Sequence, residues 1–499
     1  MPSYLVTGAS RGIGLSLVVE LLRNPTNYVI ATARNPAGSQ GLQDLFREYP
    51  PDRLSLVAME VSDKASVDSA TKAVEELVRA HSGGLDCVIN NAAIALQAYR
   101  GFEDLDLDLA EEEFRVNTLG PLRVTRAFLP LIRKGQEKKV VLVTSDQASL
   151  ELAPGLHGIL ASYALTKAAM NMMGRKWGVS LRAEGITVLL LHPGWVETDM
   201  GSPLDKWIYE NAPSLELIAT NTSAAGCVRV IRDARLEDTS VWTSVDTYDC
   251  PYPSRTVWQL QDPQNFVIAT ARNLSKARAL QELEGRYAPN RLALAALEVT
   301  DKASVDHAVG KAEELLRPHG SGLDCLINNA GVSLQENDRF EDIDLDQLVE
   351  EFRVNTVSPL RVSRAFLPLI RRGQDKKIAF MSSRQASIEL APGFSGVAEP
   401  YGVTKAALNM IGRKWGASLR AEGITAVLLH PEPGLTRSSL GWVDTDMGET
   451  TEAWMRVHMP GLKRLPVGVS AEGCIRIIKE ARLEDAVQFL GIDGKPLPW

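Results

Sequence analysis

The stretch that decides the fold is YLVTGASRGIGL, residues 4–15. Its first three residues form a short apolar run, which is typical of a buried strand. Gly8, Gly12 and Gly14 follow, and an apolar helical pattern begins after them. Glycines between a strand and a helix let the backbone turn sharply and approach a pyrophosphate at the helix N-terminus. The stretch therefore predicts a dinucleotide-binding turn; the simpler alternative is a turn with only a structural role.

Downstream of this turn, short β-branched runs alternate with segments of helical periodicity. Strands are expected at residues 4–6, 28–32, 54–57, 87–89, 140–144 and 187–191. Helices, marked by apolar residues three to four positions apart, are expected at residues 65–81, 109–132 and 162–184. This alternation predicts an α/β fold of Rossmann type: a doubly wound parallel sheet with helices on both faces and strand order 3-2-1-4-5-6.

The chain then repeats this pattern. Residues 28–193 match residues 266–431 without a gap, at a constant shift of 238 positions (266 − 28). One matched pair of segments is FRVNTLGPLRVTRAFLPLIR with FRVNTVSPLRVSRAFLPLIR. Beyond this match the second half carries nine extra residues, Glu432–Leu440, after which the shift is 247. We therefore expect two tandem Rossmann-type domains, copy 1 at residues 1–252 and copy 2 at residues 253–499.

Copy 2 lacks counterparts of the first strand and the glycine turn of copy 1. Its opening, RTVWQLQDPQNFVIA at residues 255–269, corresponds to the end of the first helix and the second strand. Residues 241–245 are a possible replacement for the first strand, but the DTYDCPYPS that follows them contains no glycine. Because the missing strand is central in this fold, we expect an unpaired seam in copy 2 unless another segment fills it. Imperfect assembly of the coding sequence across a duplicated locus is an alternative explanation.

Composition excludes several classes of protein. The chain has 499 residues and a net charge of −8 without a basic block, so neither nucleic acid nor an anionic membrane is an expected partner. No apolar run approaches the ~20 residues of a membrane span. Five cysteines without CxxC spacing indicate neither a disulfide set nor a metal site. Because the chain enters its first strand almost at once, we expect no cleavable leader and a location in the cytosol.

Polar side chains with catalytic potential lie near the carboxyl ends of the expected strands. Tyr163 and Lys167 are four positions apart on a helix, so an ammonium can lie beside a phenol. Ser145 ends the fifth strand, and Asn117 lies inside the long helix before it. Each residue alone is explained equally well by a structural role. An NNA motif follows the fourth strand and an HPG motif follows the sixth. Because ligands bind at this edge of open α/β sheets, these residues and motifs together favour a functional site.

The charge of two side chains indicates which coenzyme the turn would hold. An acidic residue after the second strand hydrogen-bonds to the ribose diol of NAD, whereas a cation there binds the 2′-phosphate of NADP. This chain has Arg34 at that point and Arg11 inside the glycine turn. NADP(H) is therefore favoured over NAD(H); the alternative is that both arginines are only solvated surface residues.

The chain resembles the short-chain dehydrogenase/reductase family in five motifs: TGxxxGxG, NNAx, a strand-end Ser, YxxxK and PG. The resemblance covers nearly the whole chain, twice. The LAPGLHG insertion and HPGWVETDMG are similar to fungal carbonyl reductases of the norsolorinic acid ketoreductase and sniffer types. The resemblance implies NADPH-dependent reduction of a ketone or aldehyde, such as an aromatic or polyketide-type carbonyl. The alternatives are a non-catalytic NADP(H)-binding scaffold or sensor, and another reaction on this fold, such as dehydration or epimerisation.

The resemblance also implies roles for individual residues. Tyr163 would give a proton to the carbonyl oxygen as NADPH gives hydride to its carbon, while Lys167 would lower the phenol pKa and bind the nicotinamide ribose. Ser145 would hydrogen-bond the developing alkoxide, and Asn117 would hold a water on the proton path. The further expected coenzyme contacts are Gly8, Ser10, Arg11, Gly12, Ile13, Gly14, Arg34, Glu60, Val61, Asp63, Asn90, Ala92, Arg123, Gly194, Val196 and Thr198.

The loop after the sixth strand commonly covers the substrate in this family. Here it carries Trp195, Trp207, Ile208 and Tyr209. These side chains favour an apolar, aromatic ketone as substrate, although packing in the core explains them equally well.

Copy 2 retains the four catalytic residue types as Asn355, Ser383, Tyr401 and Lys405. We nevertheless expect it to be inactive, because it lacks the glycine turn and its nine extra residues interrupt the loop that would touch the nicotinamide. If copy 2 folds, the long helices of the two copies are expected to pair within one chain as a pseudo-dimer, with a homo-oligomer as the other possibility.

Overall fold

The structure is a computed structural model of the chain. It describes residues 1–499 except 80, 82, 201–206, 208–209, 211–216, 240–263, 336–338, 433–440 and 444–462. The expected boundary between the copies, the possible replacement strand at 241–245, and Ile208 and Tyr209 therefore lie outside the described residues. In the part of the chain that is described, no helix combines the length and the apolar character needed to cross a membrane.

Copy 1 forms the predicted six-stranded parallel sheet, in the order β3-β2-β1-β4-β5-β6. Its strands are β1 (Ser3–Val6), β2 (Tyr28–Ala33), β3 (Leu54–Ala58), β4 (Cys87–Asn90), β5 (Lys139–Val143) and β6 (Thr187–Leu191). Five of its helices are α1 (Gly12–Leu22), α2 (Gln40–Glu48), α3 (Lys64–Arg79), α6 (Ala161–Ala183) and α8 (Thr220–Asp233). The strand order is confirmed, and each strand begins and ends within one residue of its expected bounds.

One predicted helix contains a π turn. The segment expected at 109–132 forms α4 (Leu107–Phe114), a π turn at Arg115–Leu119 and α5 (Gly120–Lys134). Pro121 accounts for the π turn, because it has no N–H to donate to the carbonyl of Asn117 four residues earlier. The expected helix is therefore present over residues 107–134, and the π turn within it falls at a candidate catalytic residue.

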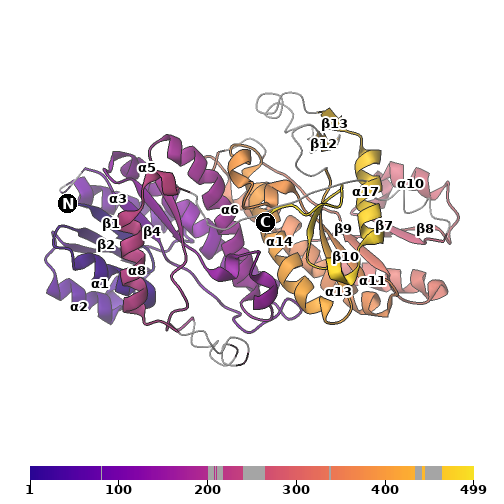
Figure 1. The fold of residues 1–499 in the computed structure, drawn as a ribbon, viewed down its shortest axis with the longest axis horizontal. Helices are drawn as coiled ribbons and strands as arrows, with labels where there is room; N and C mark the ends of the chain where they lie inside the picture. The colour runs from indigo at the N-terminus through magenta and orange to yellow at the C-terminus, as the bar shows by residue number, and fades with distance from the viewer. Residues whose placement is uncertain are drawn as a thin grey trace.

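The sheet of copy 1 has an apolar core on each face (Figure 1). Successive residues of β1 supply both cores, because side chains alternate along a strand. Leu5 packs into the core that α3, α4, α5 and α6 cover. Tyr4 and Val6 pack into the core that α1 and α8 cover. All residues of β1 are buried, as expected for the central strand that leads into the glycine turn.

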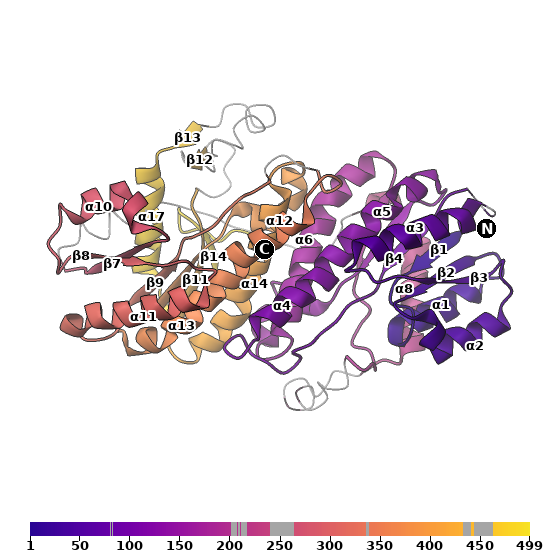
Figure 2. The same cartoon turned by 180° about the vertical axis from the view of Figure 1, so that it is seen from behind.

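Copy 2 contains the counterparts of the elements that follow the first helix (Figure 2). Its strands are β7 (Val267–Ala271), β8 (Leu292–Ala296), β9 (Cys325–Asn328), β10 (Lys377–Met381), β11 (Thr425–His430), β12 (Gly441–Val443), β13 (Lys463–Leu465) and β14 (Phe489–Gly491). Its helices are α10 (Arg278–Glu284), α11 (Lys302–Leu316), α12 (Leu345–Phe352), α13 (Ser358–Arg372), α14 (Glu399–Arg420) and α17 (Val467–Glu480).

The main sheet of copy 2 is split. Among the described residues, β7 pairs only with β8, and a separate sheet has the order β14-β11-β10-β9. In copy 1 the strand at this point is β1, which pairs with β2 and with β4. The strands beside the gap lose burial: β2 is buried throughout and β7 is not, and the same holds for β4 and β9. The seam expected from the missing strand is therefore present in the described part of copy 2.

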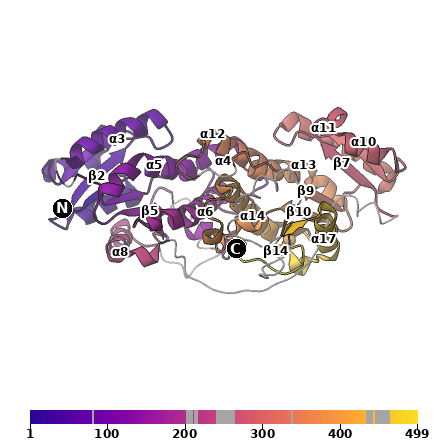
Figure 3. The same cartoon turned by 90° about the horizontal axis from the view of Figure 1, so that it is seen from above.

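The two copies pack against each other through α4, α5 and α6 of copy 1 and α12, α13 and α14 of copy 2 (Figure 3). Phe114 and Phe352 stack across the interface with ring centroids 3.9 Å apart. Arg126 Nη1 donates to the Ile343 carbonyl at 2.7 Å, and the reverse contact, related by the shift of 238, has the same length. The chain is therefore an intramolecular pseudo-dimer, as its repeat predicts.

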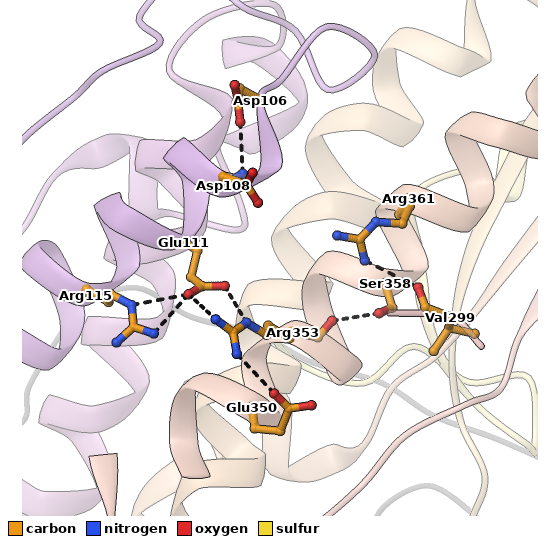
Figure 4. Close-up of polar contacts among 9 residues, drawn as sticks. All are labelled: Asp106, Asp108, Glu111, Arg115, Val299, Glu350, Arg353, Ser358 and Arg361. Atoms are coloured by element: carbon orange, nitrogen blue, oxygen red, sulfur yellow. Dashed lines mark hydrogen bonds and ion pairs between the residues drawn. The ribbon is translucent and has the colours of Figure 1, made fainter. Parts of the chain in front are cut away.

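A charge cluster lies at one side of this interface (Figure 4). The Glu111 carboxylate accepts hydrogen bonds from Arg353 Nε at 2.6 Å and from Arg115 Nη2 at 3.0 Å. Burial by itself would raise the pKa of Glu111, but the two arginines outweigh burial and lower that pKa below its ordinary value. The matched position in copy 2 is Val349, so one carboxylate serves both arginines and the interface is not symmetric.

Candidate active site

The glycine turn between β1 and α1 has a shape that requires glycine. Gly8 and Gly12 have φ angles of +66° and +55°. A Cβ atom on Gly14 would lie 2.2 Å from the Gly8 carbonyl oxygen, and one on Gly8 would lie 2.8 Å from Ala92 Cα. Arg11 precedes α1 without capping it through its side chain, which leaves the first N–H groups of the helix for an anion. The turn therefore fits a dinucleotide phosphate.

The segments after β4 and β6 lie against this turn. Thr7 Oγ1 accepts hydrogen bonds from the backbone N–H groups of Asn91 and Ala92, each at 3.0 Å. Asn91 Nδ2 in return donates to the Thr7 carbonyl at 2.9 Å. The methyl group of Thr198 lies 3.5 Å from the Cβ position of Gly12. Thr7 and Asn91 were not among the site residues expected from the sequence, although the second asparagine of the NNA motif was a visible signal.

Other expected coenzyme residues form the frame of the turn. The Ser10 carbonyl accepts a hydrogen bond at 2.7 Å from the residue before α2, and Ile13 packs on the core beneath α1. Val196 forms a β-bridge with Ile218. Gly194 has φ +86°, and a Cβ there would lie 2.8 Å from Ile218 Cδ1. The loop after β6 is thus held closely at the carboxyl edge of the sheet.

Three expected coenzyme residues have structural partners for their side chains. Asn90 Nδ2 donates to Thr125 Oγ1 at 3.1 Å, so this side chain is directed to α5. Arg123 Nη1 donates to the Val61 carbonyl at 2.8 Å. Asp63 Oδ1 accepts a backbone hydrogen bond at 3.0 Å at the start of α3. These side chains position the segments around the site, and a contact from Asn90 to a coenzyme would come from its backbone.

Arg11 and Arg34 lie on the surface beside the turn. Arg11 pairs with Asp199, and Arg34 Nε lies 3.5 Å from Glu60 Oε2. The two arginine side chains are 76% and 77% exposed, so both guanidinium groups are accessible. Exposed ion pairs of this kind are weak, so either arginine can exchange its carboxylate for a phosphate at little cost.

The predicted serine, tyrosine and lysine meet where β5 ends and α6 begins. Lys167 is buried; its Nζ donates to a backbone carbonyl of β5 at 2.7 Å and lies 5.6 Å from the centroid of the Tyr163 ring. Ser145 follows β5 and precedes the short 3-10 helix η3 (Asp146–Ala148), which packs against α6. The Ser145 Oγ accepts a hydrogen bond from the backbone N–H of Gln147 at 3.2 Å.

Asn117 joins the loop after β4 to α6. Its Oδ1 accepts from the Ile94 N–H at 2.8 Å, and its Nδ2 donates to the Ile94 carbonyl at 2.8 Å and to Thr166 Oγ1 at 3.1 Å. Both side-chain N–H groups are therefore used, and the residue is fully buried. A water held by Asn117 would have to bind elsewhere on the residue, for example at its backbone carbonyl, with which Pro121 cannot pair.

The electrostatics around Tyr163 differ from the sequence-based expectation. Burial raises the pKa of Tyr163 above its ordinary value, and the carboxylates of Asp146 and Glu113 raise it further. Burial also lowers the pKa of Lys167 to about 7 and raises that of Glu113 to about 7. The lowering of the phenol pKa that the resemblance implies is not seen here, because desolvation and two nearby carboxyl groups raise that pKa.

Apolar and aromatic side chains surround the phenol. Tyr163 forms one cluster with Ile159 and Leu160, and partly buried residues of the neighbouring loops pack against it, including Trp195 and Trp207. The Trp195 Nε1 donates to the Asp146 carboxylate. Both tryptophans singled out in the sequence therefore pack against the cluster that contains the candidate catalytic tyrosine.

Copy 2 keeps the geometry of the catalytic residues but changes their surroundings. Lys405 Nζ donates to a backbone carbonyl of β10 at 2.7 Å and lies 5.6 Å from the centroid of the Tyr401 ring, as in copy 1. At the position matched to Asp146, Arg384 instead forms a buried ion pair at 2.9 Å with Glu432, which also lies 3.3 Å from His430. Glu432 is the first of the nine extra residues, so the insertion alters this edge. The described part of copy 2 contains no counterpart of the glycine turn.

Comparison with known families agrees with this geometry. A family model described as short chain dehydrogenase matches residues 3–208 and, a second time, residues 255–455. The chain belongs to the short-chain dehydrogenase family. It is thus an oxidoreductase of that family, in which the fold is present twice in tandem.

Individual relatives match one copy at a time. The short-chain dehydrogenase/reductase AacuF of Aspergillus aculeatus is 36% identical over 212 residues, which are 41% of this chain and 77% of its own. The C-signal protein of Myxococcus xanthus is 37% identical over 177 residues, which are 36% of this chain and 93% of its own.

Solved structures resemble one copy or both. An NADPH-bound carbonyl reductase from chicken fatty liver is 34% identical, covering 48% of this chain and 94% of its own with a TM-score of 0.43. The N-domain of a bacterial malonyl-CoA reductase, solved with NADP, is 16% identical, covering 94% of this chain and 96% of its own with a TM-score of 0.66. At that identity the second likeness shows the fold alone, namely two such units in one chain.

Proposed function

We propose that copy 1 of this short-chain dehydrogenase reduces a ketone or an aldehyde to the alcohol with NADPH. The observation that carries the proposal is that Tyr163 and buried Lys167 lie beside the end of β5, at the same carboxyl edge of the parallel sheet as the glycine turn after β1. Family membership supports an oxidoreductase, and the residues at this edge supply what the reduction needs from the protein. We further propose that the copies divide near residues 252 and 253 and that copy 2 holds no coenzyme.

The coenzyme-binding residues of this proposal follow from the shape and charge of the turn. Gly8 and Gly14 let the turn keep the tight shape in which a pyrophosphate can approach the backbone, since a Cβ on either would meet neighbouring protein atoms at 2.8 Å or less. Arg11 and Arg34 offer guanidinium groups for a 2′-phosphate. NADPH bound there supplies a hydride to the carbonyl carbon.

The proton comes from the phenol. A raised pKa keeps Tyr163 protonated at neutral pH, which is the state that a general acid requires. As hydride adds to the carbon, negative charge gathers on the oxygen, and an alkoxide is more basic than a phenolate. Transfer of the Tyr163 proton to that oxygen completes the alcohol and leaves a phenolate. Lys167 lies beside the ring, and in its ammonium form it stabilises this phenolate by charge.

Ser145 and Asn117 are the other two residues with proposed roles in the reduction. The Ser145 hydroxyl lies at the end of β5 and would turn its hydrogen from the Asp146 carboxylate to the developing oxyanion; one such donor typically contributes about 3 to 4 kcal/mol. The Asn117 side chain fixes the π turn against α6, and its backbone carbonyl is the proposed acceptor for a water that returns a proton toward Lys167.

The apolar cluster around Tyr163 indicates the class of substrate. Trp195 and Trp207 present aromatic surface beside the phenol, which favours a flat, apolar carbonyl compound. The test is to incubate the full-length protein with NADPH and a panel of quinones, aromatic ketones and aliphatic aldehydes, and to follow loss of reduced coenzyme. Turnover of aromatic members supports the proposal. Tight NADPH binding without turnover of any member would instead favour a scaffold or sensor.

Coenzyme choice provides a matched test. Arg34→Ala is expected to raise the Kd for NADPH about tenfold and to leave the Kd for NADH unchanged, because a charge-assisted contact to the 2′-phosphate is lost. Arg272→Ala is the control, since Arg272 faces Glu298 in copy 2 at 3.8 Å in the same arrangement. It should change neither Kd. Equal effects of the two substitutions, or none from Arg34→Ala, would argue against a coenzyme site in copy 1 that reads the 2′-phosphate.

A further inference from the structure

Two buried lysines occupy matched positions on the helices at the centre of the pseudo-dimer. Lys176 lies on α6 and Lys414 on α14, related by the shift of 238, and these helices pack side by side (Figures 1 and 2). Neither side chain is exposed to solvent. A buried ammonium must find an acceptor, because its transfer out of water is costly. The acceptor of each lysine therefore shows how the surroundings of the two matched lysines differ.

The two lysines reach across the interface to different groups. Lys176 Nζ lies 2.7 Å from Glu399 Oε2 and donates to the Val397 carbonyl at 2.9 Å. Lys414 Nζ donates to Gln147 Oε1 at 2.6 Å. The difference follows from the sequence, because the copy 1 residue matched to Glu399 is Ala161 and offers no carboxylate.

A second divergence accommodates the Lys176 side chain. Gly402 of copy 2 stands where copy 1 has Ala164. A Cβ on Gly402 would lie 3.4 Å from Lys176 Nζ and 3.0 Å from the Gln385 carbonyl oxygen. The copies have therefore diverged on both sides of this contact, and Lys176 is directed to Glu399 rather than to Gln385, the residue matched to Gln147.

Gln147 stands next to the candidate catalytic serine. Its backbone N–H donates to Ser145 Oγ at 3.2 Å and to Asp146 Oδ1 at 2.7 Å, and Ser145 Oγ donates to the same carboxylate oxygen at 3.0 Å. A side chain that fixes Gln147 thereby fixes the turn that carries the serine hydroxyl. The pKa of Lys414 agrees with this proximity, because burial lowers it to about 7 while the Asp146 charge opposes the lowering.

Copy 2 also binds residues 150 and 151, at the far end of the segment that begins with Ser145. Arg413, the neighbour of Lys414, donates through Nε to the Leu150 carbonyl at 2.8 Å and through Nη2 to the Glu151 carbonyl at 3.2 Å. Arg175 of copy 1 makes the matched contacts to copy 2, so this anchor is symmetric. The contact between a lysine and a glutamine is not symmetric. In the described part of the chain, the buried Oε1 of Gln385, the residue matched to Gln147, has no hydrogen-bond partner.

We propose that Lys414 of copy 2 is a positioning residue for the copy 1 site, where it holds Gln147 and through it the Ser145 hydroxyl. This inference rests on the proposed reductase function of copy 1. It gives copy 2 a role that needs no coenzyme and runs in one direction only, since Lys176 does not hold the corresponding glutamine.

The test compares two changes at matched interface positions in the full-length protein. Lys414→Met is expected to lower kcat about tenfold or more with the KM for NADPH unchanged, because a small misplacement of a catalytic group is costly. The control is Lys176→Met with Glu399→Gln, which removes both charges of the other pair and should leave kcat within twofold. Wild-type kcat in Lys414→Met, or an equal loss in the control, would overturn the proposal.

Amide hydrogen exchange of residues 144–150 supplies a readout that does not depend on activity. Exchange there should be faster in Lys414→Met than in the wild type and unchanged in the control; no difference would count against the positioning role. If the wild type reduces no carbonyl compound, the proposed function fails, but the exchange comparison still decides whether Lys414 orders this segment.

A double-mutant cycle with Gln147→Met shows whether Lys414 acts through Gln147. We expect the double variant to be no slower than either single variant, whereas multiplied losses would contradict the proposed connection. The doubly apolar variant leaves no unpaired buried charge, so it also decides the case if Lys414→Met alone does not fold. Reduced kcat in the double variant supports the proposal, and wild-type kcat overturns it.

Discussion

Tyr163→Phe should lower kcat about a thousandfold while leaving the Kd for NADPH unchanged. Phenylalanine keeps the ring that packs with Ile159 and Leu160 but has no proton to give, and general acid catalysis typically contributes about 10² to 10⁴ in rate. Initial rates with the best carbonyl substrate and a coenzyme titration measure the two quantities. A loss in kcat without a loss in affinity is the signature of a group that acts on the reacting atoms.

Tyr401→Phe is the matched control, because Tyr401 has the same relation to a buried lysine in copy 2. It should leave kcat unchanged, since we place no chemistry in that copy. Turnover that survives Tyr163→Phe would end the case for a phenol as proton donor. A large loss from Tyr401→Phe would move the chemistry, or part of it, to copy 2.

Gly14→Ala is expected to abolish NADPH binding, with the Kd rising about a hundredfold or more. The added methyl group would lie 2.2 Å from the Gly8 carbonyl oxygen and 2.6 Å from Asn91 Nδ2, so the turn or the start of α1 must move away from its pyrophosphate-binding shape. Titration with NADPH measures the Kd, and thermal unfolding reports how much of the loss comes from lower stability.

Gly226→Ala serves as the control for Gly14→Ala. Gly226 lies in α8, and nothing lies within 4 Å of its Cβ position, so the substitution should keep NADPH affinity and stability. Unchanged NADPH affinity in Gly14→Ala would show that the coenzyme does not use this turn.

Local sequence patterns were sufficient for most of copy 1. The six strands could be predicted because each is a short apolar run bounded by turns, and their order followed from the fold class. The Tyr163 and Lys167 pair could be predicted because a spacing of four places two side chains on one helix face. The duplication was equally visible, and with it the gap that splits the sheet of copy 2.

The parts that the sequence did not reveal depend on contacts between distant segments. Asn117 has the right residue type for a water-binding amide, but its side chain is consumed by Ile94 and Thr166, which lie on other elements. Tyr163 has a nearby lysine, yet burial and two carboxyl groups from other elements decide the direction of its pKa. Such effects come from tertiary packing, which spacing along the chain does not encode.

The asymmetry of the interface likewise could not be predicted from the sequence. Lys176 and Lys414 are identical residues in nearly identical segments, and only the partner copy distinguishes their roles. The change from Ala161 to Glu399 is one difference among many between the copies, and its consequence for Gln147 emerges only when α6 and α14 are packed together.

The number of NADPH molecules bound per full-length chain distinguishes one coenzyme site from two, because among the described residues only copy 1 has the glycine turn. Isothermal titration of the purified wild-type protein should give one NADPH per chain. Two NADPH per chain would contradict this expectation, since copy 2 would then bind a coenzyme without a glycine turn.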